Sequence, residues 1–329
     1  MYPEFYGLKG EPFLLTPDYR FYFESRVHGQ AMAHLMYGLN RREGFIVITG
    51  DVGAGKTTIV QRLCATMDRG QVMAAHIVTT LVTGQELLRI VAAAFGIIDI
   101  SRKKDAVLLA LQSFFEGLGR EGKRALLIVD EAQNLSAGAL EELRMLSNFQ
   151  LGNASPCQIF LVAQPQFRKK LAHPDLEQLR QRVIASYHLS ALSAEECGPY
   201  IMHRLKQVDW ANDPEFRQDA MNAIFRHSDG IPRRINTLCS RLLLLGMLDN
   251  MHVFGGEDVD RVATDLQAEN GEVSAQDNGY HLDEPPGPNS GLSMRVVSVE
   301  RRLDHQEKSL RRITIGIAEL GLELARNGR

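Results

Sequence analysis

The sequence predicts an α/β fold, a doubly wound parallel sheet with helices on both faces, followed by a small all-α domain. Two observations carry this prediction. Short apolar and β-branched runs alternate with segments of helical periodicity from residue 45 to about residue 190, a pattern typical of parallel sheets. From residue 193 the strand signals stop and helical patterns continue alone to about residue 268. The change of pattern indicates a domain boundary near residue 190.

The first part should contain five strands separated by helices. Each expected strand is a short apolar run, and these runs lie at residues 45–49, 72–78, 125–129, 159–163 and 186–189. Between them, helical periodicity predicts helices at residues 56–67, 85–95, 105–117 and 137–147. Strand and helix therefore alternate as a nucleotide-binding sheet requires.

Local signals also place the helices of the second part. Ser193 and Glu196 have the spacing of a capping box, which predicts a helix start. Asp213 followed by Pro214 predicts a second start, with the acid at the N-cap and the proline in the first turn. After a Gly-Ile-Pro interruption, further helices are expected at residues 233–248 and 257–268.

The remaining C-terminal sequence has a different character. Residues 269–294 are polar and rich in Gly and Pro, so we expect a flexible linker there. In residues 295–329, apolar positions recur at alternating spacings of three and four, the rhythm of a coiled coil. This amphipathic tail either packs on its own body or, as we favour because of the linker, binds a second copy or a protein partner.

Composition limits the classes of function. The chain has 329 residues, 44% hydrophobic, and a formal net charge of −3, so nucleic-acid or lipid binding would need a local basic cluster. Its four cysteines are scattered without metal-ligand spacing, which is typical of a reduced cytosolic interior. The N-terminus lacks a signal-peptide pattern, and no transmembrane segment is expected. We expect a soluble cytoplasmic protein that meets the inner membrane face only through partners.

A phosphate-binding motif lies directly between the first expected strand and helix. It fits the pattern G-x-x-x-x-G-K-[ST] and consists of Gly50, Asp51, Val52, Gly53, Ala54, Gly55, Lys56 and Thr57. Its glycines allow the backbone N–H groups to curl around phosphates at a helix N-terminus. Lys56 should reach the β- and γ-phosphates, Thr57 should ligate Mg²⁺, and Thr58 should cap the helix or contact the α-phosphate. The motif predicts a P-loop NTPase that binds ATP with Mg²⁺.

Two other expected strands end in polar residues that suit hydrolysis. The run at 125–129 is followed by Asp130 and Glu131. Asp130 can hold the Mg²⁺ shell, and Glu131 can orient and deprotonate a water for attack on the γ-phosphate. Gln164 follows the run at 159–163, and strand ends face the ligand crevice in a doubly wound sheet. Gln164 can therefore contact the γ-phosphate or the attacking water.

Together these features resemble the AAA+ ATPases, in the branch close to the ExeA-type secretion ATPases and the TniB-type transposition ATPases. Within that branch, the chain is most similar to the secretion ATPase family associated with XrtA exosortase, or PEP-CTERM, loci. The resemblance covers residues 1 to about 268. The matching segments are M-Y-P-E-F-Y-G-L-K-G-E-P-F at 1–13, T-P-D-Y-R-F at 16–21, G-F-I-V-I-T-G-D-V-G-A-G-K-T-T from 44, L-L-I-V-D-E-A-Q-N-L at 126–135, E-E-L-R-M-L-S-N-F-Q at 141–150 and L-R-Q-R-V-I-A at 179–185.

The resemblance implies two further site residues. Arg182 stands at the position of an arginine finger, which a neighbouring subunit of a homo-oligomer would use in trans; Arg180 is the alternative. Arg233 stands in the second sensor motif, G-I-P-R-R-I-N, and would open a helix towards the γ-phosphate; Arg234 cannot be separated from it by sequence.

The resemblance also implies an organisation and a role. Residues 1–44 would form an aromatic N-terminal segment with a helix, 45–190 the ATPase core and 191–268 a helical lid. The aromatic residues of the first segment fit either a core or the adenine side of the site. The client would be a protein-sorting or exopolysaccharide export system. A DNA-dependent transposition-type regulator, binding through Arg168, Lys169 and Lys170, and a general ExeA-like secretion ATPase are the alternatives. ExeA-like proteins carry a membrane helix and a periplasmic peptidoglycan-binding region, where this chain has a linker and tail.

Overall fold

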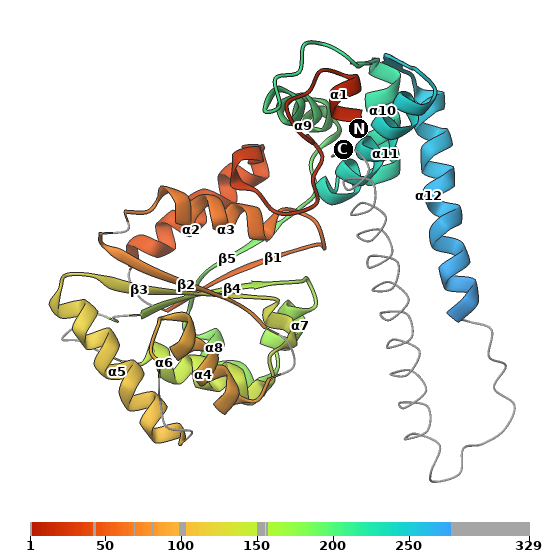
Figure 1. Cartoon of the computed structure of the whole chain (residues 1–329). Coiled ribbons are helices and arrows are strands. Elements are labelled where there is room, and N and C mark those ends of the chain that lie inside the picture. The colour runs from red at the N-terminus through yellow and green to blue at the C-terminus, as the bar shows by residue number, and fades with distance from the viewer. Residues whose placement is uncertain are drawn as a thin grey trace, which may run out of the picture. The chain divides into compact units, whose positions relative to one another are not determined.

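The structure, a computed structural model, describes residues 2–41, 44–68, 70–79, 82–98, 103–149, 155 and 157–277, with side chains described up to residue 269. The chain divides into two compact units, Met1–Glu269 and Asn270–Arg329. The first unit contains both the sheet and the helical domain (Figure 1).

Within the described residues, the main sheet has five parallel strands in the order β2-β3-β4-β1-β5. The strands are β1 Phe45–Gly50, β2 Val72–Val78, β3 Arg124–Asp130, β4 Cys157–Ala163 and β5 Val183–Leu189. All five predicted strands are confirmed, with ends that differ by at most three residues. Because the strands are parallel, the loops that follow Gly50, Asp130 and Ala163 leave the same edge of the sheet.

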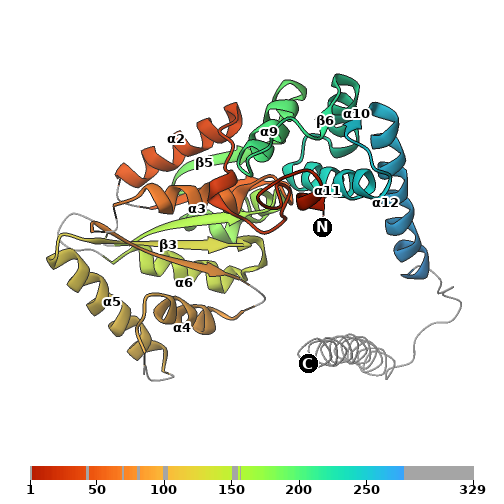
Figure 2. The same cartoon turned by 45° about the horizontal axis from the view of Figure 1, so that its top comes forward.

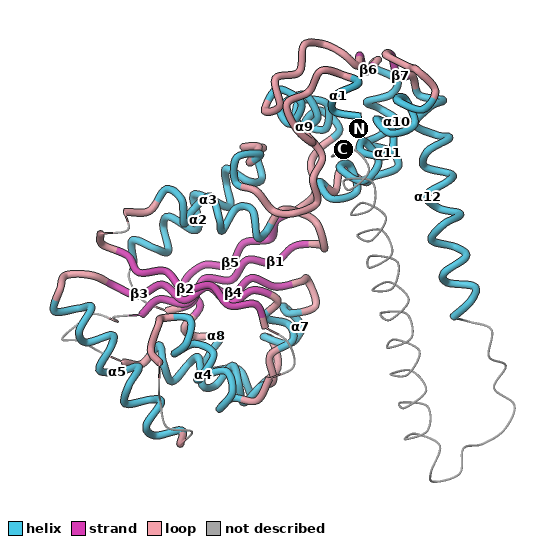
Figure 3. Tube along the Cα trace, viewed as in Figure 1, coloured by secondary structure: helices cyan, strands magenta, loops and turns pink. Residues whose placement is uncertain are grey.

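Helices cover both faces of the sheet, as Figures 1 and 3 show. One face carries α2 Arg26–Arg41 and α3 Lys56–Thr66, and the other carries α4 Gly84–Ala94, α5 Lys104–Arg120 and α6 Ala137–Ser147. The fully buried strand β1 supplies both faces: Phe45 and Val47 join one buried cluster, and Ile46 joins the other. A strand buried on both sides needs no alternation of polar residues, which is why β1 reads as a continuous apolar run.

Short elements connect these layers. They are α1 Tyr2–Phe5, η1 Tyr19–Phe21, η2 Ala132–Asn134, α7 Phe167–Leu171, η3 Pro174–Leu176 and α8 Glu177–Arg180. The aromatic N-terminal segment belongs to the core of the helical domain, since Tyr2, Tyr6 and Phe13 are buried there. The Tyr6 hydroxyl also donates to the Met251 carbonyl at 3.0 Å. Of the two alternatives for these aromatic residues, the structure therefore favours the core.

The helical domain consists of α9 Ala194–Lys206, α10 Gln218–Ser228, α11 Pro232–Leu248 and α12 Gly256–Asp277, with a short pair of strands, β6 Glu215–Phe216 and β7 Val253–Phe254 (Figure 2). The capping box of Ser193 and Glu196 at the start of α9 is confirmed. In the described part of the chain, no helix is both long and apolar enough to cross a bilayer.

Two predictions about this region are wrong. The helix predicted at Asp213-Pro214 begins only at Gln218, because the amides after Pro214 join a strand pair: Glu215 N donates to His252 O at 2.8 Å. The linker predicted from residue 269 begins too early, since α12 continues to Asp277. Residues 269–277 contain one glycine and no proline, so nothing stops an existing helix from propagating. The rest of the predicted linker and the tail, residues 278–329, lie outside the described residues.

Candidate functional site

The phosphate-binding motif occupies the turn between β1 and α3, where the sequence places it. Gly53 and Gly55 have φ values of 85° and 95°, in the left-handed region that favours glycine. A Cβ atom at Gly53 would lie 2.4 Å from the Arg233 Cβ, and one at Gly55 would lie 2.8 Å from His28 Nε2. Both glycines are therefore required by conformation and by close approach.

Lys56 is buried within the curl of this loop. Its Nζ donates to the carbonyls of Gly50 at 2.8 Å and Asp51 at 2.9 Å. Burial lowers the pKa of the amine, and the carboxylates of Glu131, Asp130 and Asp51 act in the opposite direction. A buried cation held by main-chain oxygens at a curled loop is suited to bind phosphate oxygens.

Thr57 and Asp130 lie together, as predicted for two ligands of one metal ion. Thr57 Oγ1 donates to Asp130 Oδ2 at 2.8 Å, and the Glu131 amide donates to Asp130 Oδ1 at 2.9 Å. Burial raises the pKa of Asp130, but the His76 ring, 3.7 Å away, and the hydrogen bonds from Thr57 and the Glu131 amide outweigh it and lower the pKa overall. An ionised carboxylate beside a hydroxyl is an oxygen donor set that fits Mg²⁺.

Glu131 is held by two glutamine side chains. Its Oε2 accepts from Gln164 Nε2 at 3.2 Å and from the Gln133 amide, whose Oε1 in turn accepts from the Gln164 backbone N at 3.0 Å. The structure thus brings Glu131 and Gln164 together, as the strand ends predict. Roles for Gln133 and His76 were not predicted from the sequence. Gln133 follows Glu131 by two residues, and this position was a signal that could have indicated it. No sequence signal indicated His76.

These residues open into a cavity of about 190 Å³ between the sheet and the helical domain. The core side of its lining includes Val52, Gly53, Gly55, Lys56, Thr57, Thr58 and Glu131, and the helical domain adds Tyr200, Arg204, Pro232, Arg233 and Asn236. A third wall is formed by residues 14–18 of the N-terminal segment. We call residues 12–18 the strap. The strap, Tyr200, Arg204 and Asn236 were missed, because no local pattern links such distant segments.

The structure separates the two candidate sensor arginines. The backbone N of Arg233 donates to the Gly53 carbonyl at 3.2 Å, so the start of α11 rests on the phosphate loop. The Arg234 guanidinium instead binds Asp229 Oδ2 at 2.6 Å. Arg233 lines the cavity and is the arginine that the geometry brings to the site.

Comparison with known proteins agrees with this geometry. Residues 39–171 match a family of AAA domains. The structure of Pyrobaculum aerophilum Cdc6p is similar, with a TM-score of 0.61 at 16% identity, covering 77% of this chain and 70% of that one. The Aeropyrum pernix ORC2 protein, solved as ADPNP–ADP complexes, has a TM-score of 0.60 at 19% identity over 77% and 71% of the two chains. The fold is that of an AAA+ P-loop NTPase.

A curated relative shares more sequence. General secretion pathway protein A of Aeromonas hydrophila is 35% identical over 271 residues, which cover 81% of this chain and 48% of the relative. The chain thus spans about half the length of that protein. The family match covers residues 39–171, and the solved neighbours share the fold of the whole nucleotide-binding unit.

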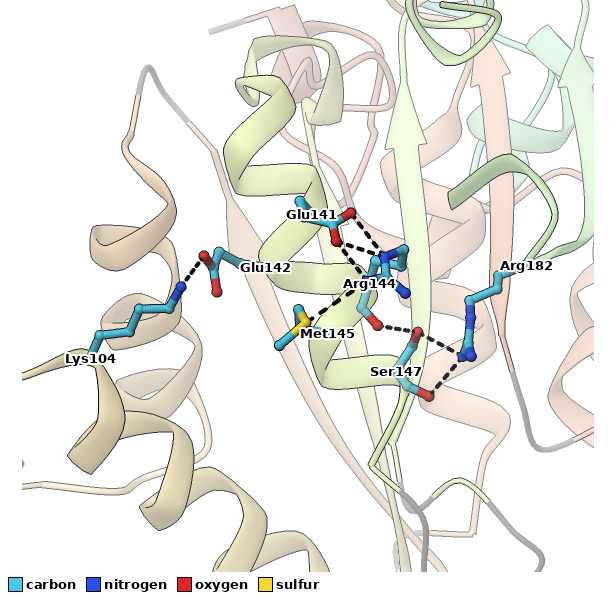
Figure 4. Close-up of polar contacts among 7 residues, drawn as sticks. All are labelled: Lys104, Glu141, Glu142, Arg144, Met145, Ser147 and Arg182. Carbon is cyan, nitrogen blue, oxygen red and sulfur yellow. Dashed lines mark hydrogen bonds and ion pairs between the residues drawn. The ribbon is translucent and has the colours of Figure 1, made fainter. Parts of the chain in front are cut away.

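In this AAA+ fold, Arg182 lies at the edge of the sheet opposite the phosphate loop. Its carbonyl accepts from the amide of Phe45, the first residue of β1, at 2.9 Å. Its Nη1 reaches the carbonyl and hydroxyl oxygens of Ser147, each at 3.4 Å, at the end of α6 (Figure 4). Arg180 is paired with Glu177. Neither arginine belongs to the cavity lining that the described residues form, so neither reaches the site of its own chain.

Proposed function

We propose that this chain hydrolyses ATP with Mg²⁺ as an oligomeric switch, and that a neighbouring copy completes each site. One observation carries the proposal: Lys56, Thr57 and Glu131 line a single cavity, and Asp130 is bonded directly to Thr57 at 2.8 Å. A site that only binds nucleotide has no need of a carboxylate beside the metal ligands.

Each residue has a role that follows from its contacts. The main-chain N–H groups of the loop and Lys56 would bind the phosphates. Mg²⁺, when bound, would neutralise charge on the phosphate oxygens, and Thr57 and Asp130 would hold it. Glu131 would take the proton of the attacking water, while the amides of Gln133 and Gln164 fix the direction of its carboxylate.

The helical domain would sense the γ-phosphate. Its link to the loop includes the hydrogen bond from Arg233 N to Gly53 O, and the Arg233 side chain lines the same cavity. A guanidinium that binds the γ-phosphate loses its partner on hydrolysis, which would release the domain from the loop.

The second copy is proposed from the position of Arg182. Its guanidinium is directed to Ser147, at the edge of the sheet away from the cavity. An arginine there can neutralise transition-state charge only in the site of a neighbour. AAA+ ATPases commonly oligomerise, which agrees with this assignment.

The client is proposed from similarity alone. The relationship to General secretion pathway protein A supports a secretion-associated role. We propose an exopolysaccharide or protein-sorting export system of the XrtA/PEP-CTERM type, with residues 295–329 as the segment that binds a partner. Deletion of the gene in its host should abolish that export; normal export in the deletion strain would contradict this part of the proposal.

The test of the enzymatic proposal is replacement of Lys56. We expect Lys56→Ala to abolish both binding of a fluorescent ATP analogue and phosphate release. Lys9→Ala removes a lysine that is 79% exposed and paired with Asp209, and it should behave as wild type. Wild-type turnover in Lys56→Ala would refute the site.

The same assay examines the transposition-type alternative. Lys170 contributes little to a basic surface, because its Nζ donates to the carbonyls of Gln133 and Leu135, and burial lowers its pKa. We therefore expect duplex DNA to leave turnover unchanged. Stimulation by DNA that disappears between about 50 and 200 mM salt would favour the regulator instead.

A further inference from the structure

A buried guanidinium holds the strap against the helical domain. Arg204 lies on α9 and is 7% exposed. Its Nε donates to the Pro12 carbonyl at 2.6 Å and its Nη2 to the Leu14 carbonyl at 3.2 Å. The guanidinium also lies over the Phe21 ring, 4.6 Å from the centroid. A single side chain thus holds the strap by two carbonyls and the segment just after it by an aromatic ring.

Besides the buried side chain of Phe13, the strap has few contacts that fix its main chain. From Gly10 to Pro17, the carbonyls of Pro12 and Leu14 are the main-chain groups to which the described residues supply a hydrogen-bond partner. The peptide groups of Leu15 and Thr16 have no partner in this part of the chain, yet both residues line the cavity. They are available to a ligand, and their position depends on Arg204.

Through Tyr200 and Asn236, the Arg204 guanidinium is also linked to α11, the helix that contacts the phosphate loop. Its Nη1 donates to the Tyr200 hydroxyl at 3.2 Å, and the side-chain amide of Asn236 is hydrogen-bonded to that hydroxyl at 2.8 Å. Asn236 lies one turn after Arg233 on α11. No ion pair of Arg204 is found among the described residues, so its buried charge is satisfied by two strap carbonyls and a hydroxyl, and the strap in turn depends on it.

We infer that Arg204 is a positioning residue for the base of the nucleotide, an inference that rests on the proposed binding of ATP in this cavity. By fixing the strap, it sets the free N–H and C=O groups of Leu15 and Thr16 in the wall of the cavity, where a base could meet them. Adenine presents an amino donor where guanine presents a carbonyl acceptor. Peptide groups held in fixed positions can pair with the edge of adenine, whereas against the edge of guanine the same groups would stay unpaired. Arg204 thereby selects ATP over GTP.

The test compares ATP and GTP turnover in Arg204→Lys. Lysine keeps the charge but lacks the planar fork that reaches two carbonyls and a hydroxyl at once. Loss of charge-assisted hydrogen bonds should raise the KM for ATP by about tenfold or more, with kcat within about twofold. The preference for ATP over GTP, expressed as the ratio of kcat/KM values, should fall by a similar factor. A matched control is Arg226→Lys, an exposed arginine of the same domain that is paired with Asp260 and should change neither value.

A second variant distinguishes the proposed effect from misfolding of Arg204→Lys. Tyr200→Phe keeps the ring and removes only the hydroxyl that accepts from Arg204, so it should shift KM and selectivity in the same direction by a smaller factor. Thermal unfolding monitors both variants. An equal change for ATP and GTP in the folded variants, or a wild-type chain that uses both nucleotides equally well, would overturn the inference. A wild-type chain without ATP turnover would instead overturn the proposed function.

Discussion

Replacing Glu131 with glutamine should separate nucleotide binding from turnover. The carboxylate Oε2 accepts hydrogen bonds from the Gln133 and Gln164 amides. Both bonds end on this one oxygen, which glutamine can also supply, so the change costs at most about 1 kcal/mol, the worth of one hydrogen bond. The melting temperature should then fall by about 2 °C or less for a chain of this size. The fold and the cavity should remain intact.

The catalytic effect should be far larger than this structural cost. Removal of a general base typically lowers kcat by about 10²- to 10⁴-fold, or about 3–5.5 kcal/mol in the activation free energy. The Kd for ATP should change by less than about threefold, because Lys56 and the loop are untouched. Phosphate release under single-turnover conditions and titration with a fluorescent ATP analogue measure the two quantities. Glu121→Gln, at an exposed glutamate paired with Lys123, is the matched control.

Turnover by Glu131→Gln at the wild-type rate would refute the assignment of the general base. Equal loss of binding and turnover would also refute the reasoning, because it would mean that the carboxylate shapes the cavity rather than the reaction. The structure predicts neither result. Among the described residues, no hydrogen bond joins Glu131 to the phosphate loop, so its replacement should leave the shape of that loop unchanged.

Three further predictions concern the loop, the neighbour and pH. Gly53→Ala should weaken ATP binding by about tenfold or more in the same titration, because its φ of 85° costs about 1–2 kcal/mol and its Cβ would meet the Arg233 Cβ at 2.4 Å; unchanged affinity would contradict this. Arg182→Ala should lower turnover by about 10³-fold or more, whereas Arg180→Ala should have little effect. Mixing Arg182→Ala with Glu131→Gln should restore part of the activity, and a failure to do so would exclude action in trans. Burial lowers the pKa of His28 in the folded chain, so as pH decreases the unfolded chain takes up this proton before the folded chain does. The free energy of unfolding, measured by urea titration, should therefore fall below about pH 6.5. The fall should be smaller in His28→Gln.

The sheet and the phosphate site were predictable because their signals are local. Strand β2 and helix α6 have the predicted ends, since an apolar run bounded by polar residues is set by its own side chains. The phosphate loop needs glycines at fixed spacings between a strand and a helix, and a few consecutive residues contain all of this information. The meeting of Glu131 with Gln164 followed from the parallel order of strands.

The parts that sequence reasoning missed depend on contacts between distant segments. The hydrogen bond from Arg204 to Pro12 joins residues 192 positions apart, and no periodicity near either residue announces it. The helix predicted at Asp213-Pro214 failed for the same reason. An acid followed by proline is a sound local signal, but the pairing of β6 with β7 uses the next amides in a ladder. Tertiary hydrogen bonds overrode the local preference.

The two sides of the nucleotide cavity differ in how strongly they are joined to the helical domain. The strap is held by a buried guanidinium with two charge-assisted hydrogen bonds to its carbonyls, each worth about 1.5–3 kcal/mol. The phosphate loop meets α11 through a main-chain hydrogen bond from Arg233 N to Gly53 O, worth about 1 kcal/mol. Strap and helical domain should therefore move together, and the weaker joint lies at the phosphates. A γ-phosphate that binds Arg233 would strengthen the weaker joint selectively, so its hydrolysis is an event that this architecture can convert into movement of the domain.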